Sequence, residues 1–189
     1  MKTVKNQNKP RLESLYKEKI VSNLQKELQL SNVMQVPKIS KIVLNIGVKE
    51  AVGDNKILQN VQKILSLIAG QHAVITVAKK SIAGFKIRQG MPLGAKVTLR
   101  RRNMYEFLDR LVNLSLPMVR DFRGIPVRFD KDGNYNLGIK EWVVFPEVDY
   151  DMSNKIFGLN VSIHTTSKDK KHTYALLKSF GMPFIQELK

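Results

Sequence analysis

The stretch of sequence that decides the fold is Lys41-Ile42-Val43-Leu44-Asn45-Ile46-Gly47-Val48. Its even positions are all apolar, whereas its odd positions include lysine, asparagine and glycine. Side chains alternate between the two faces of a strand, so this pattern predicts a strand with one buried face and one open face. Residues 95–102 and 159–166 alternate in the same way. We therefore expect an α+β fold, in which helices cover one face of a largely antiparallel sheet.

Other stretches predict two further strands and four helices. The strands are expected at 74–78 and 135–145, and the helices at 11–30, 54–70, 103–116 and 167–181. Asp54 and Gly70 have the residue types that cap a helix, and Asn103 with Glu106 forms a capping-box pattern. The sequence contains no internal repeat. We expect a single domain, residues 11–189, preceded by a basic tail of residues 1–10.

The charge of the chain is strongly positive and unevenly distributed. The 189 residues include 32 Lys and Arg against 16 Asp and Glu, a formal net charge of +16. From Asn55 to Tyr105 there is no acidic residue, although the segment contains ten basic ones. Such a segment repels itself in a compact fold unless a polyanion neutralises it. The pattern therefore favours a polyphosphate partner over a surface whose charges are only solvated.

The sequence offers little for catalysis. The chain has no cysteine, which excludes disulfides, a thiol nucleophile and thiolate metal sites. His72, His164 and His172 have no metal-ligand spacing, and phosphate-binding loops and nucleophile elbows are absent. The acids at 130–132 suit a turn, whereas those at 147–151 suit either a turn or a magnesium or general-acid site. We expect that the protein is not an enzyme and that it holds neither a metal ion nor a cofactor.

Two regions have the composition of an RNA-binding surface. The loop 79–94 combines four cations and three glycines with Phe85, which can stack on a base or pack the loop onto the domain. The predicted open face of the sheet carries neutral donors among cations, namely Lys41, Asn45, Lys96, Thr98, Arg100 and, as a further candidate, His164. That mixture suits the minor groove of structured RNA, which presents phosphates and 2′-hydroxyls.

Several other functions remain open at this point. An RNA chaperone or processing factor would bind many RNAs with little sequence preference. An RNA-modifying enzyme would need a cofactor or metal site, which the sequence does not indicate. A membrane-surface protein would need an amphipathic anchor beside its basic charge, and no apolar run reaches the roughly 20 residues that span a bilayer.

Seven runs of residues carry a resemblance to a known family. They are VMQVP (33–37), KKSIAGFKIRQG (79–90), MYEFLDR (104–110), RDFRG (120–124), GNY (133–135), FPEVDYD (145–151) and FGMPF (180–184). In order and spacing they resemble the bacterial-type family of large-subunit ribosomal protein number five, over about residues 11–184. The family usually has an arginine, a glycine and an acidic residue before the third helix, where this chain has Arg100-Arg101-Arg102.

The resemblance implies a cytoplasmic or organellar ribosomal scaffold that attaches 5S rRNA in the central protuberance. It also implies contacts with 23S rRNA, with other large-subunit proteins of the 5S rRNA complex, with P-site tRNA and with small-subunit head protein number thirteen. By matching motif, the 5S-contacting residues of the family fall on Asn45, Gln71 and Thr98. The loop near tRNA contributes Lys79, Lys80, Ser81, Phe85, Lys86 and Arg88, and the region near the intersubunit bridge contributes Arg123, Arg128, Asp130 and Asn134.

Overall fold

One antiparallel sheet organises the chain, as seen in a computed structural model that describes residues 9–52, 55–148 and 155–185. Within these residues five strands pair in the order β2-β3-β1-β5-β4, and every neighbouring pair is antiparallel. The strands are β1 (Ile39–Gly47), β2 (Val74–Val77), β3 (Pro92–Leu99), β4 (Tyr135–Ile139) and β5 (Leu159–Thr165). The expected α+β class is confirmed.

The apolar residues of the alternating strands form the buried face of the sheet. In β1 these are Ile42, Leu44 and Ile46, each with no exposed surface. The neighbouring strands contribute Ala95, Val97, Leu99, Leu159, Val161 and Ile163, which are buried as well. Burial of a Leu or Ile side chain contributes about 2 kcal/mol relative to leaving it in water. The pattern that predicted the strands is therefore also what builds the core.

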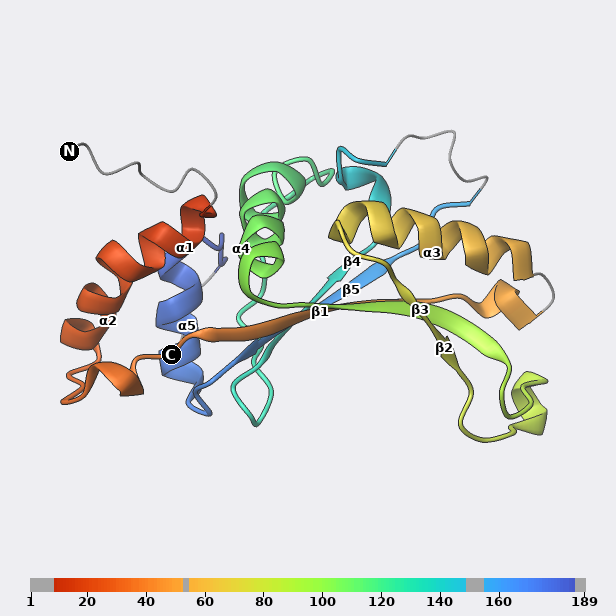
Figure 1. Cartoon of the computed structure of the whole chain (residues 1–189), viewed down its shortest axis with the longest axis horizontal. Helices are drawn as coiled ribbons and strands as arrows, with labels where there is room; N and C mark the ends of the chain where they lie inside the picture. Colours follow the sequence, from red (N-terminus) through yellow and green to blue (C-terminus); the bar gives the residue numbers. More distant parts are fainter. Residues whose placement is uncertain (1–8, 53–54, 149–154, 186–189) are drawn as a thin grey trace, which may run out of the picture.

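Helices cover this buried face and close one end of the sheet (Figure 1). Helix α3 (Asn55–Ala69) and helix α4 (Arg101–Arg110), which continues into the π-helical turn η5 (Leu111–Ser115), lie on the same side of the sheet. At one end lie α1 (Arg11–Leu15), the π-helical turn η1 (Tyr16–Ile20), α2 (Val21–Glu27) and α5 (Lys170–Ser179). Four short 3-10 helices complete the described structure: η2 (Val33–Gln35), η3 (Lys49–Val52), η4 (Ala83–Phe85) and η6 (Trp142–Val144).

The helix expected over 54–70 ends where predicted, the one expected over 167–181 forms over Lys170–Ser179, and the capping box predicted for a third is wrong. Helix α3 ends at Ala69, and Gly70 follows it with φ +62°. The carboxylate of Asp169 accepts the backbone N–H of Lys171 at the start of α5, as an N-cap does. The capping box expected at Asn103 does not form, because α4 begins at Arg101 and Glu106 pairs with Arg102 at 2.7 Å. Asp54 lies outside the described residues.

The remaining boundary errors come from a backbone turn, from the start of the next helix and from packing. The first helix ends at Glu27 rather than residue 30, because the chain turns at Gln29 with φ +52°. Strand β3 ends at Leu99, since α4 starts two residues later. The strand expected over 135–145 ends at Ile139, and its second half becomes η6. Trp142 of η6 is buried against Phe157, with ring centroids 5.4 Å apart, so its apolar run packs as a short helix.

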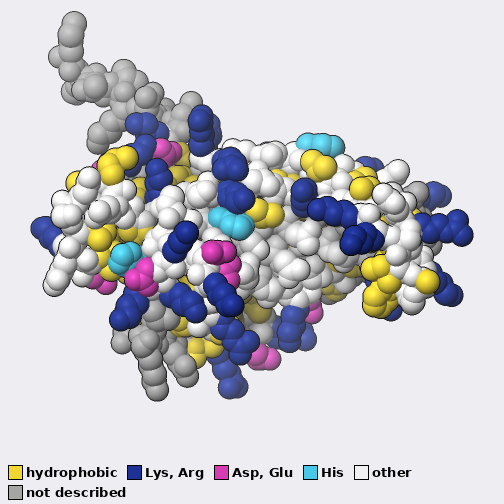
Figure 2. Space-filling model, turned by 90° about the horizontal axis from the view of Figure 1, so that it is seen from below, with side chains coloured by type: hydrophobic (Ala, Val, Ile, Leu, Met, Phe, Trp, Pro, Cys, Tyr) yellow, Lys and Arg dark blue, Asp and Glu magenta, His cyan; other side chains and the backbone are white. Residues whose placement is uncertain are grey.

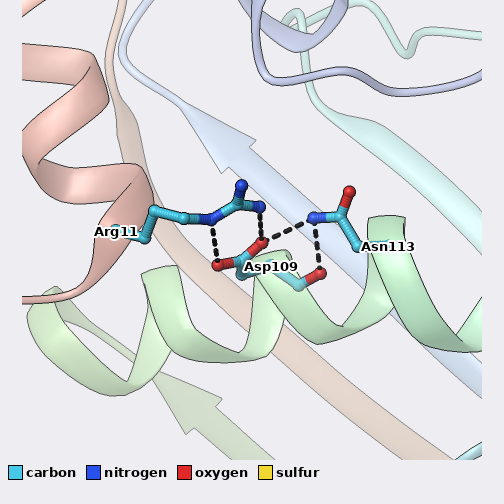
Figure 3. Close-up of polar contacts among 3 residues, drawn as sticks. All are labelled: Arg11, Asp109 and Asn113. Carbon is cyan, nitrogen blue, oxygen red and sulfur yellow. Dashed lines mark hydrogen bonds and ion pairs between the residues drawn. The ribbon is translucent and has the colours of Figure 1, made fainter.

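Helix α4 connects the other helical segments through polar contacts. Arg11 of α1 donates from Nε and Nη2 to Oδ2 and Oδ1 of Asp109, at 3.1 and 2.5 Å (Figure 3). Asn113 donates to the same Oδ1 and to the carbonyl oxygen of Asp109, so it orients that carboxylate. On the next residue, Arg110 pairs with Glu147 and donates to the carbonyl oxygen of Ile68 at 3.0 Å. These contacts position the helix layer and use two acids, Asp109 and Glu147.

Gly94 and Gly47 provide a test of the close approach of β3 and β1, since they are partners in the register. A Cβ on Gly94 would overlap the carbonyl oxygen of Ile46, whereas a Cβ on Gly47 meets nothing within 4 Å. We expect Gly94→Ala to lower the free energy of unfolding by about 2 kcal/mol through overpacking. We expect Gly47→Ala to change it by less than about 0.5 kcal/mol. Urea denaturation measures both variants, and equal stabilities would contradict this register.

Candidate nucleic-acid interface

The side of the sheet that faces away from α3 and α4 is the open face, formed by Lys41, Val43, Asn45 and Gly47 of β1 and their cross-strand partners. The register places Lys96, Asn45 and Asn160 in one row across β3, β1 and β5. All three side chains are exposed. Because neighbouring strands lie about 4.8 Å apart, this row presents an ammonium and two amides at short, regular spacing.

A second row lies next to the first and brings two of the sequence candidates together. Thr98, Val43, Ser162 and Asn136 are partners across β3, β1, β5 and β4. Gln71, which follows the cap of α3, donates from Nε2 to the carbonyl oxygen of Thr98 at 3.4 Å. The candidates from three separate segments, Asn45, Gln71 and Thr98, therefore lie in one region of the molecule.

The third row marks the end of the sheet nearest α4. Lys41 is the partner of His164, and Arg100 follows β3 with an extended backbone (φ −140°, ψ 160°). Arg100 is exposed and Lys41 is half-buried. Arg100 lies just beyond the strand, so it borders the open face rather than forming part of a β-ladder. Every open-face candidate from the sequence is thus on this face or at its edge.

The charge of this side of the molecule fits a polyanion. None of the five strands contains Asp or Glu. Figure 2 shows a broad band of neutral side chains and backbone with Lys and Arg spread over it, while Asp and Glu form only small patches. A face of this kind attracts phosphates over its whole area and offers neutral donors between the cations.

Sequence reasoning missed three open-face residues, Asn160, Ser162 and Asn136. The alternation of 159–166 put Asn160 and Ser162 on the polar side of their strand, but it could not say which strand lies beside them. Pairing of β5 with β1 is what places Asn160 next to Asn45. A periodic pattern identifies a face, whereas the neighbours across that face depend on long-range pairing.

The loop 79–94 forms a structured hairpin, closed by Ile82 and Ile87. Ile82 and Ile87 exchange backbone hydrogen bonds of 2.9 and 3.1 Å, and the hydroxyl of Ser81 accepts the N–H of Gln89 at 2.9 Å. Phe85 at its tip is 71% exposed, so of the two alternatives for this residue, packing of the loop onto the domain is wrong. The basic side chains of the loop, Lys79, Lys80, Lys86 and Arg88, are exposed as well. The hairpin projects beyond the sheet, at the end opposite α1 and α2 (Figure 1).

In the region 121–135 some candidate residues have a structural task. Asp130 accepts the N–H groups of Asp132 and Asn134 through Oδ1 and the amide of Asn134 through Oδ2, which closes the turn before β4. Burial raises the pKa of Asp130, but these hydrogen bonds and the charge of His164 outweigh it, so the pKa is lowered. Arg123 and Arg128 are exposed. Of the four candidates, the two arginines are the ones free to contact a partner through their whole side chains.

The other candidate chemical sites have ordinary explanations in the structure. Glu147 pairs with Arg110, while Asp149 and Asp151 lie outside the described residues. His72 lies 3.3 Å from the amide of Gln62, and His172 is 3.8 Å from Asp169. Among the residues that the structure describes, no group of three His, Asp or Glu could hold a metal ion. No helix in that part of the chain is long and apolar enough to cross a membrane.

A helix-backed sheet with an open cationic face is typical of one class, that of RNA-binding platform proteins. Two family models agree with this class: the model for ribosomal protein L5 matches residues 32–88, and the model for the C-terminus of the same ribosomal family matches residues 92–184. The chain therefore belongs to the ribosomal protein L5 family. It is a structural, RNA-binding protein of the large ribosomal subunit and not an enzyme.

Curated relatives support the same assignment over nearly the whole chain. Proteins named "Large ribosomal subunit protein uL5" from Geobacter sulfurreducens, Burkholderia multivorans and Dichelobacter nodosus are 58%, 57% and 54% identical to it. Each similarity extends over 175 residues, 92% of this chain and 98% of the relative. The similarity thus includes both the open face and the hairpin.

The environment of His164 predicts a pH dependence of stability. Burial lowers the pKa of His164 from 6.5, the charge of Lys41 lowers it further, and Asp130 acts in the opposite direction. Below pH 6.5 the unfolded chain binds a proton at this histidine more readily than the folded one. We expect the free energy of unfolding to fall as the pH is lowered from 7 through 6.5, and His164→Asn to reduce that fall. Urea titrations of both proteins across this range measure it; parallel curves would contradict the assignment.

Proposed function

We propose that the chain binds 5S rRNA through the open face of its sheet and helps to attach that RNA in the central protuberance. The row Lys96–Asn45–Asn160 is the observation that carries this proposal. The minor groove of A-form RNA is wide and shallow, so a flat platform can reach its 2′-hydroxyls and the phosphates on either side. The binding unit is a single domain from residue 11 onward, preceded by a basic tail.

Affinity and register come from different side chains on this face. Lys41, Lys96 and Arg100 neutralise phosphates and release counterions, which supplies affinity without sequence preference. Asn45, Gln71 and Thr98 donate or accept single hydrogen bonds, which fix the position of the platform on a folded RNA. Neutralisation of about six phosphates would give a log–log salt slope of roughly −4 to −5.

The other partners belong to other parts of the molecule. The hairpin tip carries Phe85 among exposed cations, which suits the sugar–phosphate backbone of P-site tRNA. Arg123 and Arg128 suit the small-subunit head protein number thirteen at an intersubunit bridge. Contacts with 23S rRNA and with the other large-subunit proteins of the 5S rRNA complex complete the proposal, as the resemblance implies. Because these regions differ from the open face, they can be tested separately.

The first test separates neutral from charged contacts on the open face. We expect Asn45→Ala and Thr98→Ala each to weaken 5S rRNA binding about five-fold, since each loses about one hydrogen bond. Their salt slopes should equal that of the wild type. Lys96→Ala should instead make the slope shallower by about 1, because one phosphate contact is lost. Filter binding at several salt concentrations measures both quantities.

Asn60→Ala is the matched control, since Asn60 is an exposed asparagine of α3 in the helix layer. This variant should bind 5S rRNA like the wild type. Wild-type affinity in Asn45→Ala and Thr98→Ala at fixed salt would contradict the open-face assignment. Equal affinity of the wild type for 5S rRNA and for an unrelated folded RNA would instead favour the RNA chaperone.

A second test addresses the hairpin tip. Phe85 is 71% exposed, so Phe85→Ala should change the free energy of unfolding by less than about 0.5 kcal/mol. It should leave 5S rRNA binding unchanged, because Phe85 is outside the open face. In large subunits reconstituted with the variant, binding of P-site tRNA should weaken. Wild-type tRNA affinity in those subunits would overturn the role proposed for the tip.

A further inference from the structure

Arg101 lies at a strained corner between β3 and α4. Its φ is +51°, in the left-handed region that residues with a Cβ seldom adopt, because the Cβ crowds the neighbouring carbonyl oxygen. It follows Arg100, whose backbone is extended, and is itself the first residue of α4. A glycine would adopt this conformation without strain. The chain therefore keeps an arginine where its backbone conformation is unfavourable.

The electrostatics of the same corner are unfavourable too. Three adjacent arginines repel one another, and they surround the positive end of the α4 dipole, where acids are preferred. The first turn of α4 contains no acidic residue. Arg102 is compensated by Glu106 at 2.7 Å, but among the described residues no acid pairs with Arg100 or Arg101. Both side chains are exposed.

The position of the corner indicates which partner neutralises the charge of Arg101. The register pairs Ile42 with Leu99, so the next positions, Lys41 and Arg100, lie at the same end of the open face. From there the chain passes from the sheet to α4, so Arg101 extends the cationic border of the open face toward the helix layer. The sugar–phosphate backbone of an RNA bound to the open face would meet Arg101 next where it leaves the end of that face. Its guanidinium can bind a phosphate through two parallel N–H donors, which a lysine cannot do.

We propose that Arg101 is a further RNA-binding residue of this chain, held in the left-handed conformation to place its guanidinium on a phosphate of the RNA that covers the open face. The inference rests on the proposed function, because the RNA concerned is 5S rRNA. The phosphate contact offsets in the complex the strain and repulsion that the free protein carries. In the free protein, Arg101 therefore makes this corner less stable than a glycine would. In the complex with RNA, the phosphate contact makes the corner more stable than a glycine would.

Arg101→Gly separates these two effects. We expect the melting temperature of the free variant to rise by about 2 °C, because glycine relieves the strain at φ +51°. We expect its log–log salt slope for 5S rRNA to become shallower by about 1, because one phosphate contact is lost. Arg101→Lys should have a salt slope close to that of the wild type, because it keeps the positive charge. Arg101→Asn, whose side chain tolerates the left-handed region, should have the same shallower slope as the glycine variant.

Gln29→Gly is the matched control, because Gln29 is also exposed and also has a positive φ, +52°, but it is neutral and follows the C-cap of α2. It should raise the melting temperature similarly and leave the salt slope unchanged. If the wild type binds 5S rRNA and Arg101→Gly has the wild-type slope, the inference is overturned and the proposed function remains. If the wild type does not bind 5S rRNA, both are overturned. A lower melting temperature for both Arg101→Gly and Arg101→Asn would contradict the strain argument.

Discussion

The structure depends on one pleated antiparallel sheet, of which one face packs into the core and the other faces water. Ile42, Leu44 and Ile46 of β1 point into a core with no exposed surface, while Asn45 between them is exposed. Because a one-residue shift of any strand would exchange its two faces, hydrophobic burial under α3 and α4 also determines which polar residues face outward. The core and the candidate RNA-binding surface are therefore two results of the same register, and neither can change without the other.

Charge is divided between the two sides of the sheet in a way that supports this arrangement. Acids of the helix layer are used in contacts between elements, as in Arg11–Asp109 and Arg110–Glu147. The more exposed of the two pairs, Arg11–Asp109, contributes about 0–1 kcal/mol by itself. The five strands have no acids, so the positive charge of the open face stays uncompensated within its own strands. A folded polyanion is the partner that such a surface requires.

The candidate site was predictable in part. The alternation of polar residues along 41–48 and 95–102 was sufficient to assign Asn45, Lys96 and Thr98 to one face. It was not sufficient to place Gln71 beside Thr98, or Asn160 beside Asn45, because those proximities arise from segments far apart in the sequence. The exposure of Phe85 was not predictable either, because it depends on how the hairpin closed by Ile82 and Ile87 projects beyond the sheet.

Local sequence signals were enough to assign the buried positions of the strands, the end of a helix at Gly70, and the segment where positive charge accumulates. These are properties of neighbouring residues, so they can be read from the order of amino acids. Two kinds of contact settled the places where local signals competed. Glu106 bonds Arg102, its i,i+4 neighbour, instead of capping a helix at Asn103, so one local pattern displaced another. The run after Ile139 packs as a short helix because Trp142 fills the core, and that outcome depends on contacts made only after the sheet and helices have come together.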